Sequence, residues 1–179
     1  MKRTAVLHIV LCALFAALSA ALSQVSIPLG LVPVVLTQVS VFLAAGLLGW
    51  KWGALSQALF AAAVAAGLPV FAGFRGGLGA LLGPTGGFIW GYILSALAAG
   101  LLLDRLGRSW RGLLPALLLG IAAVYLPGVP WLMHTAHLGL RFTLITYVLP
   151  YLPGDIAKAA LCAAVIPRLH RALRKIQLQ

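Results

Sequence analysis

Long apolar runs, separated by short breaks, constrain the fold of this chain more than any other feature of its sequence. A membrane-spanning helix needs about 20 predominantly apolar residues. Of the 179 residues, 63% are hydrophobic and only 8% are charged, a composition that excludes an ordinary soluble domain. The length accommodates roughly six spans with short loops. We therefore expect an all-α integral membrane protein with six transmembrane helices, organised as a single membrane domain over residues 1–179.

The positions of the basic residues predict the orientation of these helices. The net charge of +11 is placed at the ends of the apolar runs and not along one basic face, which argues against nucleic-acid binding. With the N-terminus in the cytoplasm, the inner side holds most of the 13 Lys and Arg residues, namely Lys2, Arg3, Lys51, Arg105, Arg108, Arg111, Arg168, Arg171, Arg174 and Lys175. Only Arg75, Arg141 and Lys158 are left for the outer side. The positive-inside rule predicts both termini inside, in a multi-pass protein of the cell (inner) membrane.

Breaks in the apolar pattern give the expected helix boundaries. The expected helices are Ala5–Ser23, Val34–Gly49, Gly53–Ala66, Thr85–Leu103, a fifth that begins near Gly112 and is broken by Pro127, Gly128 and Pro130, and Asp155–Leu169. Proline lacks the backbone donor that a helix interior needs. For residues 131–152 we expect a loop plus a partial helix over the outer face. The three irregular segments, Gln24–Pro33, Gly67–Pro84 and Pro127–Pro153, then lie together on the outside.

The segment Gly67–Gly91 is the most irregular part of the chain. It contains nine glycines and two prolines in 25 residues. Irregular backbone persists at membrane depth only when it is buried in protein or lines a cavity. A flexible connector is the alternative, but connectors are normally polar, whereas this segment carries Val70, Phe71 and Phe74. The pattern favours Gly-rich outer loops that cap a ligand pocket.

Asp155 and Lys158 are the best candidates for polar ligand contacts. Their spacing places both on one helical face. An ordinary reading is a carboxylate at a helix start with an incidental ion pair. Ionisable groups in membrane segments are costly and usually face a cavity, however, which favours a pocket offering one acceptor and one cation. Arg75, the only charge of the central loop, could meet an anionic group or simply point at water.

The remaining polar residues have more ordinary interpretations. Gln38, Ser56, Gln57 and Thr85 are more often helix–helix hydrogen bonds than ligand contacts. His134 and His137 lack an evident third metal ligand, and Cys12 and Cys162 are most simply small core residues. We find no nucleotide-binding loop, nucleophile–base pair or zinc signature, so we expect no enzyme activity, no cofactor and no metal. An alanine stripe with Ala13, Ala17 and Ala21 lets another helix approach the first one closely.

Three segments together are similar to the signatures of a known family. They are Ile27–Pro33 (IPLGLVP), Gly67–Gly87 (GLPVFAGFRGGLGALLGPTGG) and Leu152–Lys158 (LPGDIAK). They resemble the BioY family, the biotin-specific S components of energy-coupling-factor (ECF) vitamin transporters. The resemblance implies a six-helix protein that captures biotin from the exterior. It also implies a coupling transmembrane subunit and ABC-type ATPases as partners, alongside membrane lipid.

The resemblance also implies roles for particular residues. It places the polar binding pair at Asp155 and Lys158, a central-loop position at Arg75, and docking on the coupling subunit at Ala13 and Ala17. Phe88 stands where the family commonly has Tyr, and Arg75 where a smaller residue such as Asn is expected.

Biotin itself suggests how such a pocket would be built. It has a ureido ring, an apolar thiophane and a carboxylate tail, so a mostly apolar pocket with one acceptor and one cation would suit it. Our hypothesis is that Asp155 accepts from the ureido N–H groups and Lys158 meets the tail. The other predicted substrate-binding residues are Phe71, Phe74, Phe88, Thr85 and Gln38. The alternatives are an S component for a different vitamin, a small membrane-embedded enzyme, and an assembly subunit without a ligand.

Overall fold

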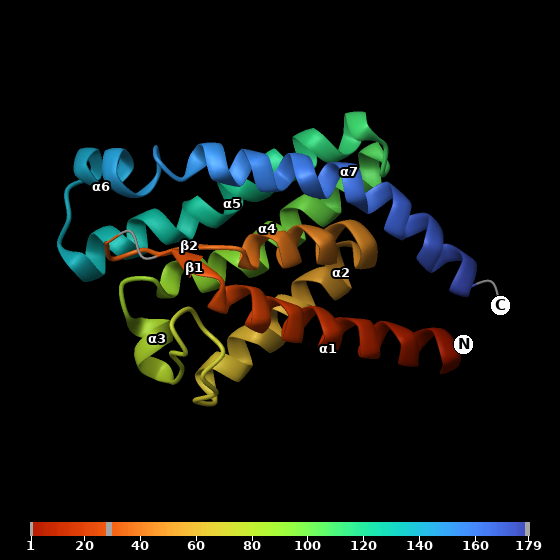
Figure 1. Ribbon diagram of the computed structural model, residues 1–179, viewed down its shortest axis with the longest axis horizontal. Helices are drawn as coiled ribbons and strands as arrows, with labels where there is room; N and C mark the ends of the chain where they lie inside the picture. Colours follow the sequence, from red (N-terminus) through yellow and green to blue (C-terminus); the bar gives the residue numbers. More distant parts are fainter. Residues whose placement is uncertain (1, 28–29, 178–179) are drawn as a thin grey trace.

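The computed structural model describes residues 2–27 and 30–177, so residues 28 and 29 of the predicted loop Gln24–Pro33 lie outside the described part. Figure 1 shows a helical bundle with one two-stranded antiparallel hairpin. Four described helices are long and apolar enough to cross a membrane, and the bent pair α6–α7 makes a fifth candidate span. In chain order the elements are α1 (Lys2–Gln24), β1 (Ser26–Ile27), β2 (Val34–Val35), α2 (Thr37–Ala65), α3 (Leu78–Leu82), α4 (Gly86–Leu106), α5 (Trp110–Ala136), α6 (Leu140–Tyr147) and α7 (Leu152–Gln177).

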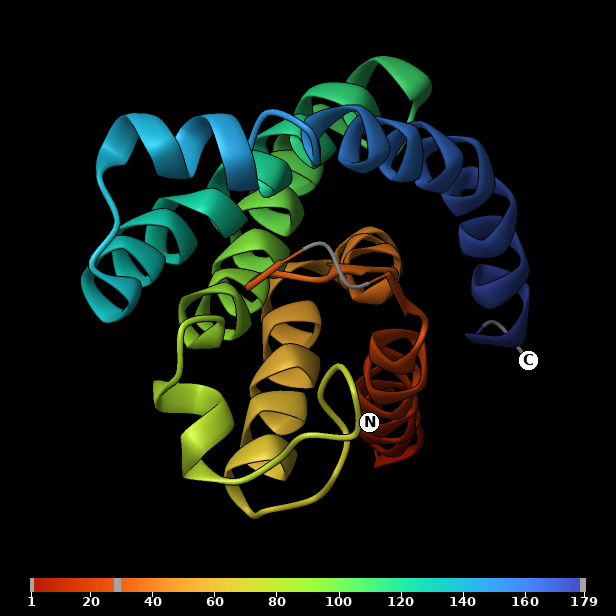
Figure 2. The same ribbon diagram turned by 60° about the vertical axis from the view of Figure 1, so that its left-hand side comes forward.

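The long helix α2 consists of two arms. Gly49 has φ 78° and ψ −177°, which is not helical. A Cβ placed on Gly53 would lie 3.1 Å from the Cα of Ala45. In a straight helix those two residues would be about 12 Å apart along the axis, so the chain reverses at Gly49 and the arms pack against each other. The two helices predicted here therefore exist as the two arms of α2, which Figure 2 shows running in different directions. Val34 and Val35 belong to β2 and not to the first arm.

Arg108, in the connection between α4 and α5, hydrogen-bonds the turn of α2 and forms an ion pair with Asp104. Arg108 donates from Nε to the Gly46 carbonyl at 2.7 Å, and its Nη2 lies 3.2 Å from Asp104 Oδ1. The Gly46 carbonyl needs this donor because its ordinary helical partner would be residue 50, beyond the break. Asp104 thus balances the charge of a neighbouring arginine.

The predicted break of the fifth helix at Pro127, Gly128 and Pro130 is wrong. Helix α5 runs through all three residues to Ala136, and its C-cap residue His137 has a left-handed φ of 53°. Membrane helices tolerate proline because neighbouring helices and small local adjustments compensate for the lost hydrogen bonds. Gly128 has a packing role: a Cβ there would lie 2.6 Å from Phe88 Cδ1. The short helix α6 that follows agrees with the partial helix expected within residues 131–152.

Helix α7 begins earlier than predicted. It starts at Leu152 and includes Pro153 in its first turn, where the missing proline N–H has no intrahelical partner to lose. The Asp155 N–H donates to the Tyr151 carbonyl at 3.0 Å. This early start places Asp155 in the first turn of α7.

Polar contacts attach α1 to α2, and one face of α1 stays uncovered. The Ser19 hydroxyl lies 3.0 Å from both Ser40 Oγ and Gln57 Oε1. On the opposite face Ala13, Ala17 and Ala21 are exposed. Gln57 therefore makes the helix–helix hydrogen bond expected for it, and the alanine stripe is open to a partner. Cys12 and Cys162 are buried and free, as the sequence predicts.

Candidate ligand-binding site

A cavity lies where β2, the Gly-rich loop and α4, α5 and α7 meet. It contains about 540 Å³ of space not filled by atoms, part of which is open to solvent. Most of its wall is apolar or aromatic, as is usual for small-molecule sites. The lining residues are Val32, Pro33, Val34, Val35, Gln38, Phe71, Thr85, Phe88, Tyr92, Val124, Tyr125, Tyr147, Tyr151, Asp155 and Lys158.

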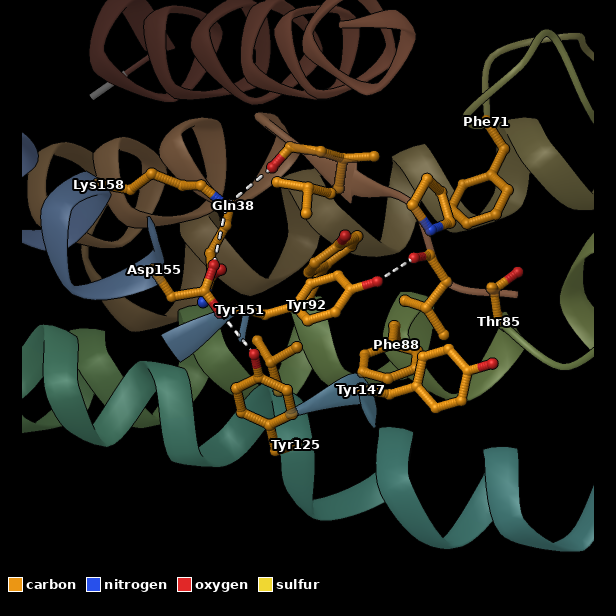
Figure 3. Close-up of a pocket in the computed structure, with 15 residues that line it drawn as sticks. Gln38, Phe71, Thr85, Phe88, Tyr92, Tyr125, Tyr147, Tyr151, Asp155 and Lys158 are labelled. Atoms are coloured by element: carbon orange, nitrogen blue, oxygen red, sulfur yellow. Dashed lines mark hydrogen bonds and ion pairs between the residues drawn. The ribbon is translucent and has the colours of Figure 1, made fainter. Parts of the chain in front are cut away.

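One end of the cavity carries a buried acid and base. Lys158 Nζ lies 2.8 Å from Asp155 Oδ1, and Asp155 is only 6% exposed. Tyr125 donates its hydroxyl to Asp155 Oδ2 at 2.7 Å, and Lys158 also donates to the Val35 carbonyl at 2.9 Å (Figure 3). Each carboxylate oxygen can accept a further hydrogen bond, and the ammonium group has a third N–H. The predicted pair thus exists and offers both a free acceptor site and a free donor to the cavity.

Gln38 adds a second donor at the same end. It is 5% exposed, and its Nε2 has no hydrogen-bond partner within the described residues. Figure 3 places it on the Asp155–Lys158 side of the cavity. A buried donor without a partner costs about 1–3 kcal/mol, so such groups call for a functional explanation. In a cavity wall, the simplest explanation is an acceptor supplied by a ligand.

All four tyrosines of the chain line this cavity, and our sequence-based set omitted them. Tyr151 donates its hydroxyl to the Val32 carbonyl at 2.5 Å, which fixes the segment that leads into β2. Tyr125 packs edge-on against Phe88, with ring centroids 6.2 Å apart. A sequence signal existed: Tyr125, Tyr147 and Tyr151 lie in or next to the predicted outer segment Pro127–Pro153, and a tyrosine there supplies both apolar surface and a hydroxyl.

The structure brings together six of the eight predicted substrate-binding residues. Those on the cavity wall are Gln38, Phe71, Thr85, Phe88, Asp155 and Lys158. Phe74 is 73% exposed at the tip of a small hairpin and does not line the cavity. Arg75 also lies outside the wall, with its guanidinium 5.4 Å from the ring centroid of Phe71 and its Nε donating to the Ala72 carbonyl at 3.0 Å. Arg75 thus packs against Phe71, a residue of the cavity wall, without lining the cavity itself.

Metal binding has no support in the described part of the chain. It contains no group of three or more His, Cys, Asp or Glu residues able to hold a metal ion. His137 ends α5, and His134 lies in the last turn of that helix.

Known proteins similar to this chain agree on one family. The sequence profile of the BioY family matches residues 1–175. A Pyrococcus horikoshii protein named "Probable biotin transporter BioY" is 39% identical over 160 residues, covering 89% of this chain and 94% of the relative. A Thermotoga maritima protein named "Biotin transporter BioY" is 37% identical over 158 residues, covering 88% and 92%. A crystal structure described as the "S-component for biotin from an ECF-type ABC transporter" matches with TM-score 0.88 at 31% identity, covering 96% of this chain and 94% of that one.

Proposed function

This chain belongs to the BioY family, and from that membership we propose that it is the membrane subunit that binds biotin for uptake. It works with a coupling transmembrane subunit and ABC ATPases, which supply the energy; the family is one of transporters and not of enzymes. The observation that carries the proposal is the buried Asp155–Lys158–Gln38 group at one end of an otherwise largely apolar and aromatic cavity. Such a cavity is complementary to a ligand with one polar, flat ring and an apolar body.

The distance between Asp155 and Lys158 supports one orientation of biotin over the other. Our sequence-based hypothesis gave the ureido ring to Asp155 and the carboxylate tail to Lys158. Two groups 2.8 Å apart meet the same end of a ligand, however, and the ureido ring and the carboxylate are at opposite ends of biotin. The ureido ring is therefore placed against the pair. Asp155 accepts from a ureido N–H, and Lys158 and Gln38 Nε2 donate to the ureido oxygen.

The rest of biotin then points toward the Gly-rich loop. Phe71 and Thr85 lie at the opposite end of the cavity from the ion pair (Figure 3). The thiophane packs on Phe88 and its aromatic neighbours. The tail reaches this end of the cavity, where the Thr85 hydroxyl and Arg75, which packs on Phe71, are the predicted partners for a carboxylate. Phe74 belongs to the outer cap of this loop and not to the wall.

The proposed membrane arrangement has six crossings with both termini in the cytoplasm. It treats residues 1–179 as a single membrane domain, counts the two arms of α2 separately and takes α6–α7 as one bent span. The basic residues Lys51, Arg105 and Arg108 then lie at the inner surface of the cell membrane, as the positive-inside rule requires. The exposed Ala13 and Ala17 form the surface on which the coupling subunit docks, because small residues permit close helix packing.

A ligand titration tests this function. The protein purified in detergent is titrated calorimetrically with biotin, with desthiobiotin and riboflavin as comparisons. We expect saturable binding of biotin at one site, weaker binding of desthiobiotin, which keeps the ureido ring and the tail, and no binding of riboflavin. Absence of saturable biotin binding, or tighter binding of riboflavin, would overturn the proposal.

A further inference from the structure

The last turn of α1 is hydrogen-bonded to the Gly-rich loop that forms one wall of the cavity. Ser23 donates its hydroxyl to the Val70 carbonyl at 2.5 Å. Gln24 donates from Nε2 to the Phe71 carbonyl at 3.1 Å, and its Oε1 accepts from the Phe74 N–H at 3.0 Å. The two chain segments are nearly fifty residues apart in sequence, so this contact is tertiary and not local.

The Gln24 carboxamide binds the loop as a neighbouring strand would. Its Nε2 donates to the Phe71 carbonyl, and its Oε1 accepts from the Phe74 N–H. The loop itself is a short hairpin closed by the bridge between Phe71 and Arg75, with Gly73 and Phe74 both at positive φ. A hairpin this small is marginal on its own and depends on contacts with its surroundings. Gln24 supplies two of those contacts at the tip.

Phe71 connects this attachment to the cavity. The backbone carbonyl of Phe71 is held by Gln24, while its ring lines the cavity and is only 4% exposed. Among the described residues of α1, none lines the cavity itself. Gln24 does not line the cavity and acts on a ligand through the loop, since it helps to hold the backbone that carries the Phe71 ring.

We propose that Gln24 is a positioning residue that keeps the Phe71 ring in the cavity wall and thereby slows release of the bound ligand. The effect on ligand release rests on the proposed function, whereas the attachment of the loop to α1 does not. Loss of both Gln24 hydrogen bonds loosens the loop tip and lets the Phe71 ring move out of the cavity wall, although Ser23 still holds the Val70 carbonyl. Because two hydrogen bonds to the loop are lost, dissociation is expected to become about tenfold faster. The ion pair and Gln38 stay in place, so the polar contacts to the ligand are kept.

The test compares two substitutions on α1. Gln24→Leu keeps the approximate volume of the side chain and removes both hydrogen bonds to the loop. Ser19→Ala is the matched control, because Ser19 bonds Ser40 and Gln57 on α2 and does not touch the loop. Dissociation of radiolabelled biotin from purified protein is measured after a chase with unlabelled biotin. We expect Gln24→Leu to release biotin about tenfold faster, and Ser19→Ala to release it at the wild-type rate with a lower melting temperature.

Hydrogen exchange without ligand gives a second readout that does not depend on biotin. In Gln24→Leu, backbone amides of residues 70–77 are expected to exchange faster than in the wild type, with unchanged exchange in α4 and α5. In Ser19→Ala the loop should exchange as in the wild type. Wild-type release together with wild-type loop exchange in Gln24→Leu would overturn the inference. A wild-type protein that does not bind biotin would refute the proposed function instead, and loop exchange alone would then decide on the attachment.

Discussion

Replacing Gln38 by leucine separates a ligand-binding residue from a structural one. The Gln38 Nε2 is buried without a partner in the described part of the chain, and we assign it to the ureido oxygen of biotin. If a buried polar group stabilises the fold, removing it lowers the stability of the protein. If a buried polar group serves to bind a ligand, it lowers the stability of the ligand-free protein and contributes only to ligand affinity. Gln38→Leu is therefore predicted to have opposite effects on stability and on affinity.

The structure gives rough magnitudes for both effects. An unpaired buried donor costs about 1–3 kcal/mol, which the substitution removes from the empty protein. Part of this gain is lost because leucine is branched where the glutamine chain is straight, so we expect an unchanged or slightly higher melting temperature, at about 2–4 °C for each kcal/mol. A hydrogen bond between two neutral partners contributes about 0.5–1.5 kcal/mol. The Kd for biotin should rise about tenfold, which corresponds to about 1.4 kcal/mol.

The matched control lies on the same helix. Gln57 is also buried, but its amide is satisfied: it accepts from Ser19 and donates to Ser56 Oγ at 3.0 Å. Gln57→Leu should lower the melting temperature and leave the Kd for biotin unchanged. Both variants are measured by calorimetric titration and by thermal unfolding, with and without biotin. If Gln38→Leu binds biotin as the wild type does, or if it melts several degrees lower without ligand, our assignment of Gln38 is refuted.

Three further predictions address the orientation of the ligand and the docking surface. Lys158→Met should raise the Kd about 100-fold, since hydrogen bonds to charged groups contribute about 1.5–3 kcal/mol. The increase should be the same for biotin and for its methyl ester. A weaker affinity for biotin alone would show that Lys158 binds the carboxylate tail. Arg75→Ala should weaken binding of biotin more than that of the methyl ester in the same titration, and equal losses would remove Arg75 from tail recognition. Ala17→Trp should leave biotin binding by the purified protein unchanged. It should abolish uptake in cells that also express the coupling subunit and ATPases, because the large side chain prevents close helix packing. Normal uptake would exclude this face as the docking surface.

The sequence predicts those features that depend on local spacing. The apolar runs locate the helices, the Gly49–Trp52 region marks the division of α2, and the interval from Asp155 to Lys158 already places both groups on one face. Each of these follows from the period of the helix or from the length of a span, so no knowledge of distant residues is required.

The features that the sequence does not predict depend on contacts between distant segments. Helix α5 continues through Pro127 and Pro130 because α4 packs closely against it, and Gly128 fits on Phe88 of that helix. The tyrosines reach the cavity from three different parts of the chain, and Phe74 and Arg75 leave it because the loop folds back on itself at its tip. A list of polar or aromatic residues cannot show which of them face a common space.

The turn of α2 has a consequence for how the protein is made. The Gly46 carbonyl at this turn accepts a hydrogen bond from Arg108, which is synthesised 62 residues later. Until that arginine emerges from the ribosome, water is the available partner for this carbonyl, and hydrocarbon offers none. We therefore expect the turn of α2 to stay in contact with water until Arg108 is made and donates to this carbonyl.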